Sequence, residues 1–304
     1  MAFLLALQGA AAQGLAWSIL ALGAYISFRL LDFPDMTMDG AFTLGACVSA
    51  VAIVAGLPPV LALFLAFLAG AGAGGITGLL HTKLGIPAIL AGILTQIGLY
   101  SVNLRILGRA NQPFLQLTTL YKQVQDGIAQ IGPSLSTDQV AVLLGLLLAF
   151  GVVAFLYWFF GTEIGSAIRA TGNNAEMVRA LGQSTDQTMV LALCLSNAWV
   201  GFAGGLVAMY QGAADVGMGA GAIVIGLASI VIGETILPHV RAFGSKLSAV
   251  VLGSVLYRAM VALVLQLGLH TNDMKLLTAL LVVVALYLPQ VLAARRGKRE
   301  GRHV

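Results

Sequence analysis

Long apolar runs fill most of this chain, and short polar segments separate them. A helix needs about 20 such residues to cross the ~30 Å hydrocarbon core of a bilayer, and about nine runs have a suitable length. They cover residues 10–31, 40–57, 59–80, 86–106, 140–160, 188–210, 218–237, 246–268 and 274–293. The pattern predicts an all-α, polytopic membrane protein with about nine transmembrane helices.

Composition supports one membrane domain, because only 9% of the 304 residues are charged and soluble domains carry roughly 25%. No polar linker divides the chain, so a single domain is expected over 1–304. The net charge of +4 would suit a nucleic-acid binder if it were spread over a surface. Instead, basic residues concentrate in the tail 294–304, as beside a membrane, so no nucleic-acid partner is expected.

Basic residues of short loops prefer the cytoplasm, which orients the predicted helices. With the tail inside, the other inside residues are Arg29, Lys83, Arg169, Arg179, Arg241 and Lys246. The outside set is smaller and contains Arg105, Arg109, Lys122 and Lys275. We therefore expect an outside N-terminus, a cytoplasmic C-terminus and membrane lipid as the main surroundings.

Sequence signatures of metal sites and enzymes are missing. Cys47 and Cys194 stand alone in apolar runs, and the four histidines are scattered, so neither a metal nor a cofactor is expected. No complete GxxxxGK[ST] motif occurs, so the chain does not bind ATP by that route. No nucleophile and base pair is recognisable either, and we expect a protein without catalytic residues.

The first candidate site is the acidic segment 32–40, between the first two apolar runs. Asp39 directly precedes an apolar run, so it either caps the N-terminus of a broken helix or lines a transport path. Asp35, Asp39 and Thr43 are retained as candidates for the path.

A second copy of this pattern follows a later apolar run. Asp215 and Met218 repeat the Asp-x-x-Met of Asp35 and Met38, each before a run of small residues. In the predicted topology the two copies follow spans of opposite direction, as in the inverted repeats of transporters. Asp215 and Met218 therefore join the path candidates.

Two charged residues lie inside predicted spans, where charge is costly and indicates function by default. Glu234 is late in the seventh span and Arg258 midway along the eighth. Glu234 either lies near the cytoplasmic surface beside Arg241 or belongs to the path. Arg258 either forms an ion pair with an acid such as Asp273 or contacts the solute. The guanidinium of Arg258 would suit a carboxylate.

Two other patterns concern packing. Glycines 70, 72, 74, 75 and 78 of the third run predict close helix contacts. Residues 108–139 form the longest segment between runs, and apolar positions such as Phe114 and Tyr121 recur at helical spacing. We expect a helix on the outer face, either a packed cap or a docking surface.

The segment 161–187 predicts two short helices separated by a Gly-Asn break. Asn174 suits the N-cap of the second helix, Glu176 suits its positive end, and Gly182 suits its left-handed C-terminal residue. Met177 and Leu181 fall along one side. This is either a docking helix for a cytoplasmic protein or an amphipathic linker.

These residues resemble the permeases of the branched-chain amino-acid ABC transporter family, within the type II importer group, over essentially the whole chain. The residues from Gly165 to Asp186 follow the family pattern G-x-A-x-R-A, N/D-x-x-M, A-x-x-L-G. The resemblance implies that this stretch is a coupling helix seated in the ATPase. The coupling residues would be Arg169, Asn173, Glu176, Met177, Arg179, Leu181 and Gly182.

The acidic sequence from Asp32 to Asp35 is similar to that of a poorly characterised branch of permeases. Permeases of that branch are paired with binding proteins for amino acids, including aromatic amino acids. The resemblance implies a homodimer with cytoplasmic ABC ATPase subunits and an extracytoplasmic solute-binding protein in a prokaryotic inner membrane. It would import an amino acid or a related compound by alternating access. A proton-coupled secondary carrier using Asp39 and Glu234 is the alternative, but it leaves the docking segment unexplained.

Overall fold

The structure is a computed structural model that describes residues 2–130, 132, 135–238, 242–266 and the single positions 276, 279, 280, 283 and 287. Helices and one pair of short strands make up the described elements. They are α1 (Ala2–Tyr25), the π-helix η1 (Ile26–Leu30), α2 (Met38–Val54), α3 (Pro59–Thr82), α4 (Ala88–Leu107), β1 (Asn111–Pro113), α5 (Leu120–Ala129), α6 (Thr137–Phe159), α7 (Glu163–Asn173), α8 (Ala175–Ala180), α9 (Thr185–Gln211), β2 (Ala213–Asp215), α10 (Ala222–Ile236) and α11 (Phe243–Gln266).

The prediction of an all-α polytopic membrane protein is confirmed. Six helical segments in the described part are long and apolar enough to cross a membrane, namely α1 with η1, α3, α4, α6, α9 and α11. The shorter apolar helices α2 and α10 fall on two further predicted spans. The ninth predicted span, 274–293, and the basic tail lie outside the continuously described residues.

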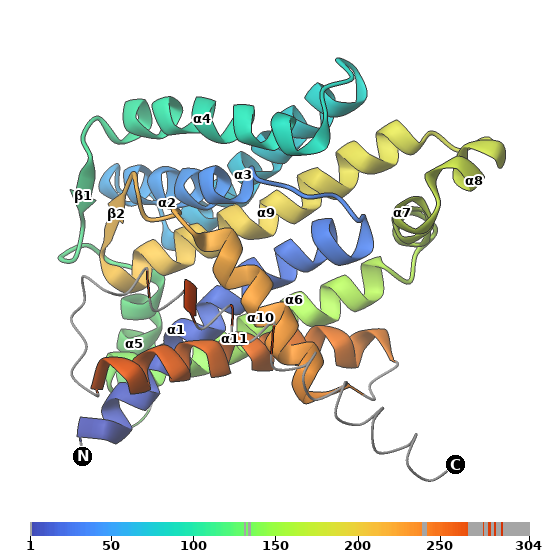
Figure 1. Ribbon diagram of the computed structural model, residues 1–304. Coiled ribbons are helices and arrows are strands. Elements are labelled where there is room, and N and C mark those ends of the chain that lie inside the picture. The colour runs from blue at the N-terminus through green and yellow to red at the C-terminus, as the bar shows by residue number, and fades with distance from the viewer. Residues whose placement is uncertain are drawn as a thin grey trace, which may run out of the picture.

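The long helices lie side by side with the shorter α2 and α10 among them, and the connecting elements lie at the two ends of the bundle (Figure 1). α7 and α8 project at one end, whereas α5 and the two strands lie at the other, where α1 begins. The bundle axis therefore runs from the strand end to the α8 end.

Helix α9 occupies the centre, and the predicted glycine contacts of α3 form against it. A β-carbon added to Gly70 or Gly74 would overlap the carbonyl oxygen of Asn197 or Leu193, and one on Gly78 would meet the α-carbon of Val190. Spaced four residues apart, these glycines share one face of α3 and let the two backbones approach closely.

Irregular backbone precedes both short helices. Residues 31–37 connect η1 to α2, and Asp32 adopts a left-handed φ of 54° there. Turns fill 216–221, so α10 begins at Ala222 and not at the predicted residue 218. Such backbone at membrane depth is tolerated where protein surrounds it.

The strand end contains the predicted helix of segment 108–139. It is α5, capped by the Thr119 hydroxyl, and Phe114 and Tyr121 are both buried. Burial and the neighbouring Tyr210 raise the pKa of Tyr121, so its phenol stays neutral. The strands were not predicted, because β1 has three residues and its antiparallel partner β2 is distant in sequence.

Candidate functional site

The predicted coupling segment consists of α7 and α8, which connect α6 to α9 outside the bundle (Figure 1). The Thr162 hydroxyl accepts a hydrogen bond from the Gly165 backbone at 3.3 Å and caps α7. The Asn174 side chain accepts one from the Met177 backbone at 3.0 Å and caps α8, as predicted. Gly182 has a φ of 81°, the left-handed conformation expected after the helix.

The break between the two helices is one residue long and lies later than predicted. Gly172 and Asn173 both belong to α7, and Asn174 alone separates the helices. The glycine serves packing, because an added β-carbon would overlap the carbonyl oxygen of Leu30. Its role was misread because close approach and helix termination both favour glycine.

One face of α8 carries apolar side chains without protein cover. Leu181 is 74% exposed and Met177 is 51% exposed, whereas Val178 is buried against the rest of the chain. Asn173 and Glu176 are exposed beside them. Exposed apolar groups rimmed by polar ones are typical of an interaction surface.

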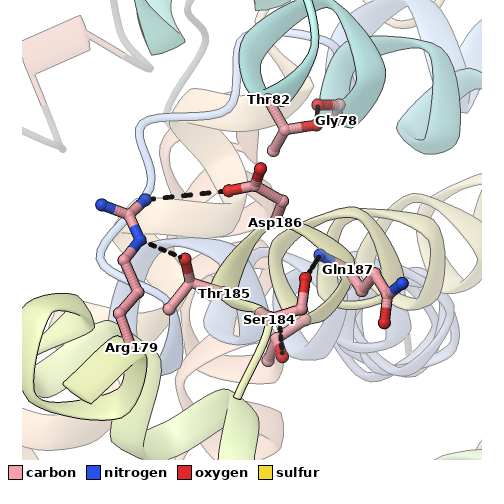
Figure 2. Close-up of polar contacts among 8 residues, drawn as sticks. Gly78, Thr82, Arg179, Ser184, Thr185, Asp186 and Gln187 are labelled. Carbon is pink, nitrogen blue, oxygen red and sulfur yellow. Dashed lines mark hydrogen bonds and ion pairs between the residues drawn. The ribbon is translucent and has the colours of Figure 1, made fainter. Parts of the chain in front are cut away.

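Arg179 fixes α8 to the first turn of α9 (Figure 2). Its Nε donates to the Thr185 hydroxyl at 2.7 Å, and its guanidinium lies 3.7 Å from Asp186 Oδ1. Ser184 caps α9 by accepting from the Gln187 backbone. Exposed ion pairs contribute little stability, so this contact chiefly sets the direction of α8.

Arg169 of α7 is exposed and contacts an aromatic ring of α11. Its guanidinium carbon lies 5.2 Å from the ring centroid of Phe243, at the start of α11. This contact connects α7 to α11, and the coupling role of Arg169 stays a prediction.

Asp35 is fully buried in a polar cluster that connects the segment 31–37 to three helices. Its carboxylate accepts from the Thr37 backbone at 2.9 Å and from Asn197 Nδ2 at 2.6 Å. The Thr37 hydroxyl lies 2.6 Å from that of Thr77, which donates to Thr95 at 2.9 Å. Among the described residues, no basic side chain pairs with Asp35.

Asp39 caps a helix, but not the one that follows it in sequence. It lies in the first turn of α2, and its two carboxylate oxygens accept from the backbones of Gly221 at 3.0 Å and Ile223 at 2.9 Å. The Thr43 hydroxyl accepts from the Gly219 backbone at 3.1 Å. The N-termini of α2 and α10 therefore meet, with the Asp39 carboxylate at the positive end of α10.

The two Asp-x-x-Met segments share local geometry. Asp215 accepts from the Gly217 backbone at 2.7 Å, as Asp35 accepts from that of Thr37 two residues on. Met218 is partly buried against the core. The matching turns, each before a short apolar helix, agree with the inverted repeat expected from the sequence.

A cavity of about 480 Å³ opens where these segments meet α4, and we call it the α4 cavity. Val216, Gly217 and Ala220 form one wall. The polar residues around it come from α2 and α4 and are Asp39, Thr43, Gln96, Tyr100, Ser101 and Asn103. Its size suits a small solute.

Glu234 and Arg258 lie away from this cavity. Glu234 forms an ion pair with Arg29 of η1. The expected neighbour of Glu234, Arg241, lies outside the described residues.

Arg258 stacks on an aromatic ring of α1. Its guanidinium carbon is 4.2 Å from the ring centroid of Trp17, and it donates to Gln13 at 3.4 Å. The expected partner Asp273 lies outside the described residues.

Of the predicted path residues, Asp39 and Thr43 lie beside the segment 215–218 in the structure. Glu234 and Arg258 lie apart from this group. Sequence reasoning missed the polar residues of α4, such as Gln96 and Asn103. Their signal was a run of amide and hydroxyl side chains in an apolar helix. No group of three potential metal ligands occurs among the described residues.

Comparisons with known proteins match almost the entire chain. The family model described as branched-chain amino acid transport system, permease component, matches residues 6–286. A tyrosine transport system permease protein of Clostridioides difficile is 36% identical over 274 residues, covering 90% of this chain and 88% of that protein. No solved structure matches the chain.

Two further relatives extend this range. An uncharacterized protein of Rickettsia prowazekii is 32% identical over 277 residues, covering 90% of this chain and 94% of its own length. The autoinducer 2 import system permease protein LsrC of Yersinia enterocolitica is 29% identical over 217 residues, covering 71% of this chain and 56% of that protein.

Proposed function

Because this chain belongs to the permease-component family of the branched-chain amino acid transport systems, we propose that it is the membrane-spanning subunit of an importer for an amino acid or a related compound. The family and the apolar helices make it a multi-pass protein of the bacterial inner membrane. Its relative in Clostridioides difficile is described as a tyrosine permease, so an aromatic amino acid is the first substrate to test.

The exposed apolar face of α8 carries the proposal. ABC permeases work with ATPase subunits, and α8 presents Met177 and Leu181 on a short helix fixed by Arg179 to α9. ATP binding and hydrolysis in the partner would move α8, and α9 would transmit the movement into the bundle. The permease itself breaks no bond; its residues position, couple and line the path.

A homodimer with a path between the two copies is part of this proposal. Tyr100 and Ser101 are exposed near the middle of α4, where lipid would leave their hydroxyls without partners. A water-filled path bounded by a second copy would solvate them. Two ATPase subunits on the α8 side and a solute-binding protein at the strand end would complete the importer.

A proton-coupled carrier is the weaker candidate. It requires acidic groups that are free to load and release protons, and Asp39 and Glu234 were the residues expected to do so. Glu234 is paired with Arg29, and both Asp39 oxygens accept backbone N–H groups. A carrier also gives no role to the exposed face of α8.

The test is co-purification of the partner ATPase with Leu181→Asp, using Leu115→Asp as the matched control. Both leucines are 74% exposed, and Leu115 follows β1 by two residues. A charge buried in an ATPase groove would be strongly unfavourable. We expect Leu181→Asp to lose the ATPase and its vanadate-sensitive activity, and Leu115→Asp to retain both.

Equal recovery of the ATPase with both variants would refute the assigned coupling surface. A wild-type chain that purifies without any ATPase and accumulates solute under a proton gradient would replace the importer with the carrier.

A further inference from the structure

Asn103, one of the residues that line the α4 cavity, has a buried hydrogen-bond acceptor that no described residue satisfies. Asn103 lines the cavity and is 1% exposed. Its Nδ2 donates to the Gly40 carbonyl at 3.3 Å, which defines the orientation of the amide, and its Oδ1 has no partner in the described part of the chain. Buried polar atoms are nearly always paired, so this oxygen indicates a missing donor.

A second acceptor lines the same cavity and is adjacent in sequence to Gly40, the residue to which Asn103 donates. Asp39 precedes Gly40, lines the same cavity, and accepts one backbone N–H at each carboxylate oxygen. A carboxylate has about four lone-pair sites, so it can accept further hydrogen bonds. No lysine, arginine or histidine is among the described residues that line this cavity.

We propose that the α4 cavity binds the ammonium group of the transported solute, with Asn103 Oδ1 and the Asp39 carboxylate as its acceptors. The inference rests on the proposed importer and identifies which chemical group this site recognises. An ammonium group offers three donors and no acceptor, so it complements a cavity whose lining residues include an unpaired amide oxygen and a carboxylate. A solute carboxylate at the same point would meet two acceptors and a like charge.

The remaining geometry suits an amino acid. The cavity volume of about 480 Å³ leaves room for a side chain beside the bound amine. Tyr100 and Gln96 lie along the same stretch of α4 and contribute an aromatic face and an amide to the wall. Asp39 is itself held by the N-terminus of α10, so bound amine and helix position are coupled through one side chain.

The experiment measures local protection of a thiol introduced by Ser101→Cys, at an exposed position of the cavity wall. The permease is purified with its ATPase, and its alkylation by a maleimide is timed against the chain lacking the substitution. Three probes differ in one group: L-tyrosine, tyramine without the carboxylate, and 3-(4-hydroxyphenyl)propionate without the amine. We expect the first two to slow alkylation and the third to leave it unchanged.

Two variants at Asn103 separate recognition from structure. In Asn103→Leu the half-protecting concentration of tyramine should rise about tenfold or more, because a hydrogen bond to a charged group is lost. Asn103→Asp keeps an acceptor but cannot donate to Gly40, so recognition predicts retained protection. A purely structural asparagine predicts that both variants fail alike.

The inference is overturned if the propionate protects as well as tyramine, if no probe protects, or if Asn103→Asp fails as Asn103→Leu does. Loss of the ATPase during purification of the unsubstituted chain would instead count against the importer. Protection can still be measured on the permease alone, so the two failures are distinguishable.

Discussion

Asp35 combines complete burial with hydrogen bonds that any replacement must reproduce. It accepts from the Thr37 backbone and from Asn197, whose own Oδ1 lacks a partner among the described residues. The cluster holds irregular backbone against α9 within the bundle. The chemistry required at position 35 is therefore acceptance of hydrogen bonds, more than negative charge.

Asp35→Asn should consequently be tolerated better than Asp35→Leu. The amide can still accept from Thr37, and Asn197 can turn its oxygen toward it by giving up the 3.1 Å bond from its Nδ2 to the Leu193 carbonyl. Leucine leaves two buried donors, one at Thr37 and one at Asn197, without an acceptor at about 1–3 kcal/mol each. Thermal unfolding in detergent should show a small decrease for the first variant and a large one for the second. Equal decreases would mean that the charge itself is required.

Single residues were predicted unevenly, for physical reasons. Asn174 and Gly182 follow local capping rules, so their roles were readable from neighbouring positions. Asp39 was recognised as a capping acid, yet the helix that it caps starts 183 residues later. Asn103 and Asn197 matter through tertiary contacts, which a single sequence does not specify.

At the scale of the helices, α3 offers an internally controlled test of packing. Gly74 touches α9 so closely that a β-carbon would overlap a carbonyl oxygen, whereas one on Gly72 of the same helix would meet nothing within 4 Å. From the sequence alone, both glycines are predicted to make close helix contacts. Their directions differ because residues two apart lie on nearly opposite faces of a helix.

Gly74→Val should therefore greatly reduce the yield of folded protein, while Gly72→Val should leave it close to wild type. Overpacking a close helix contact costs about 1–3 kcal/mol or more, and lipid tolerates an added apolar side chain. Size-exclusion profiles of the two variants in detergent give the comparison. Similar profiles would show that α3 and α9 can separate without cost.

Element boundaries were predicted best where apolar runs were long and ended in prolines or polar residues. α3 and α4 match their predicted runs within two residues at each end. α10 starts later than predicted because apolar composition does not distinguish helix from the turns at 216–221. The strands were missed because three residues are too few to show an alternating pattern.

At the scale of the whole molecule, α7 and α8 lie at one end of the bundle, and α5 and the two strands lie at the other. Basic residues and the assigned role of α8 both favour the α8 end inside. α5 would then lie outside together with the start of α1.

Labelling with a membrane-impermeant maleimide tests the orientation. Lys122→Cys on α5 should react in intact spheroplasts, and Glu176→Cys on α8 should react only after permeabilisation. Both positions are exposed, while native Cys47 is buried and Cys194 partly so. The reverse pattern would invert the topology and remove α8 from the ATPase side.

The contact between Arg179 and the first turn of α9 means that a movement of α8 would tilt α9. With 27 residues, α9 is about 40 Å long. It ends two residues before β2, which leads directly into the wall of the α4 cavity. A tilt of about 5° at its α8 end would displace the far end by roughly 3.5 Å, about the width of one carbon atom. Close packing would make α3 turn with it, so in the proposed importer a small displacement of α8 would change the width of the path.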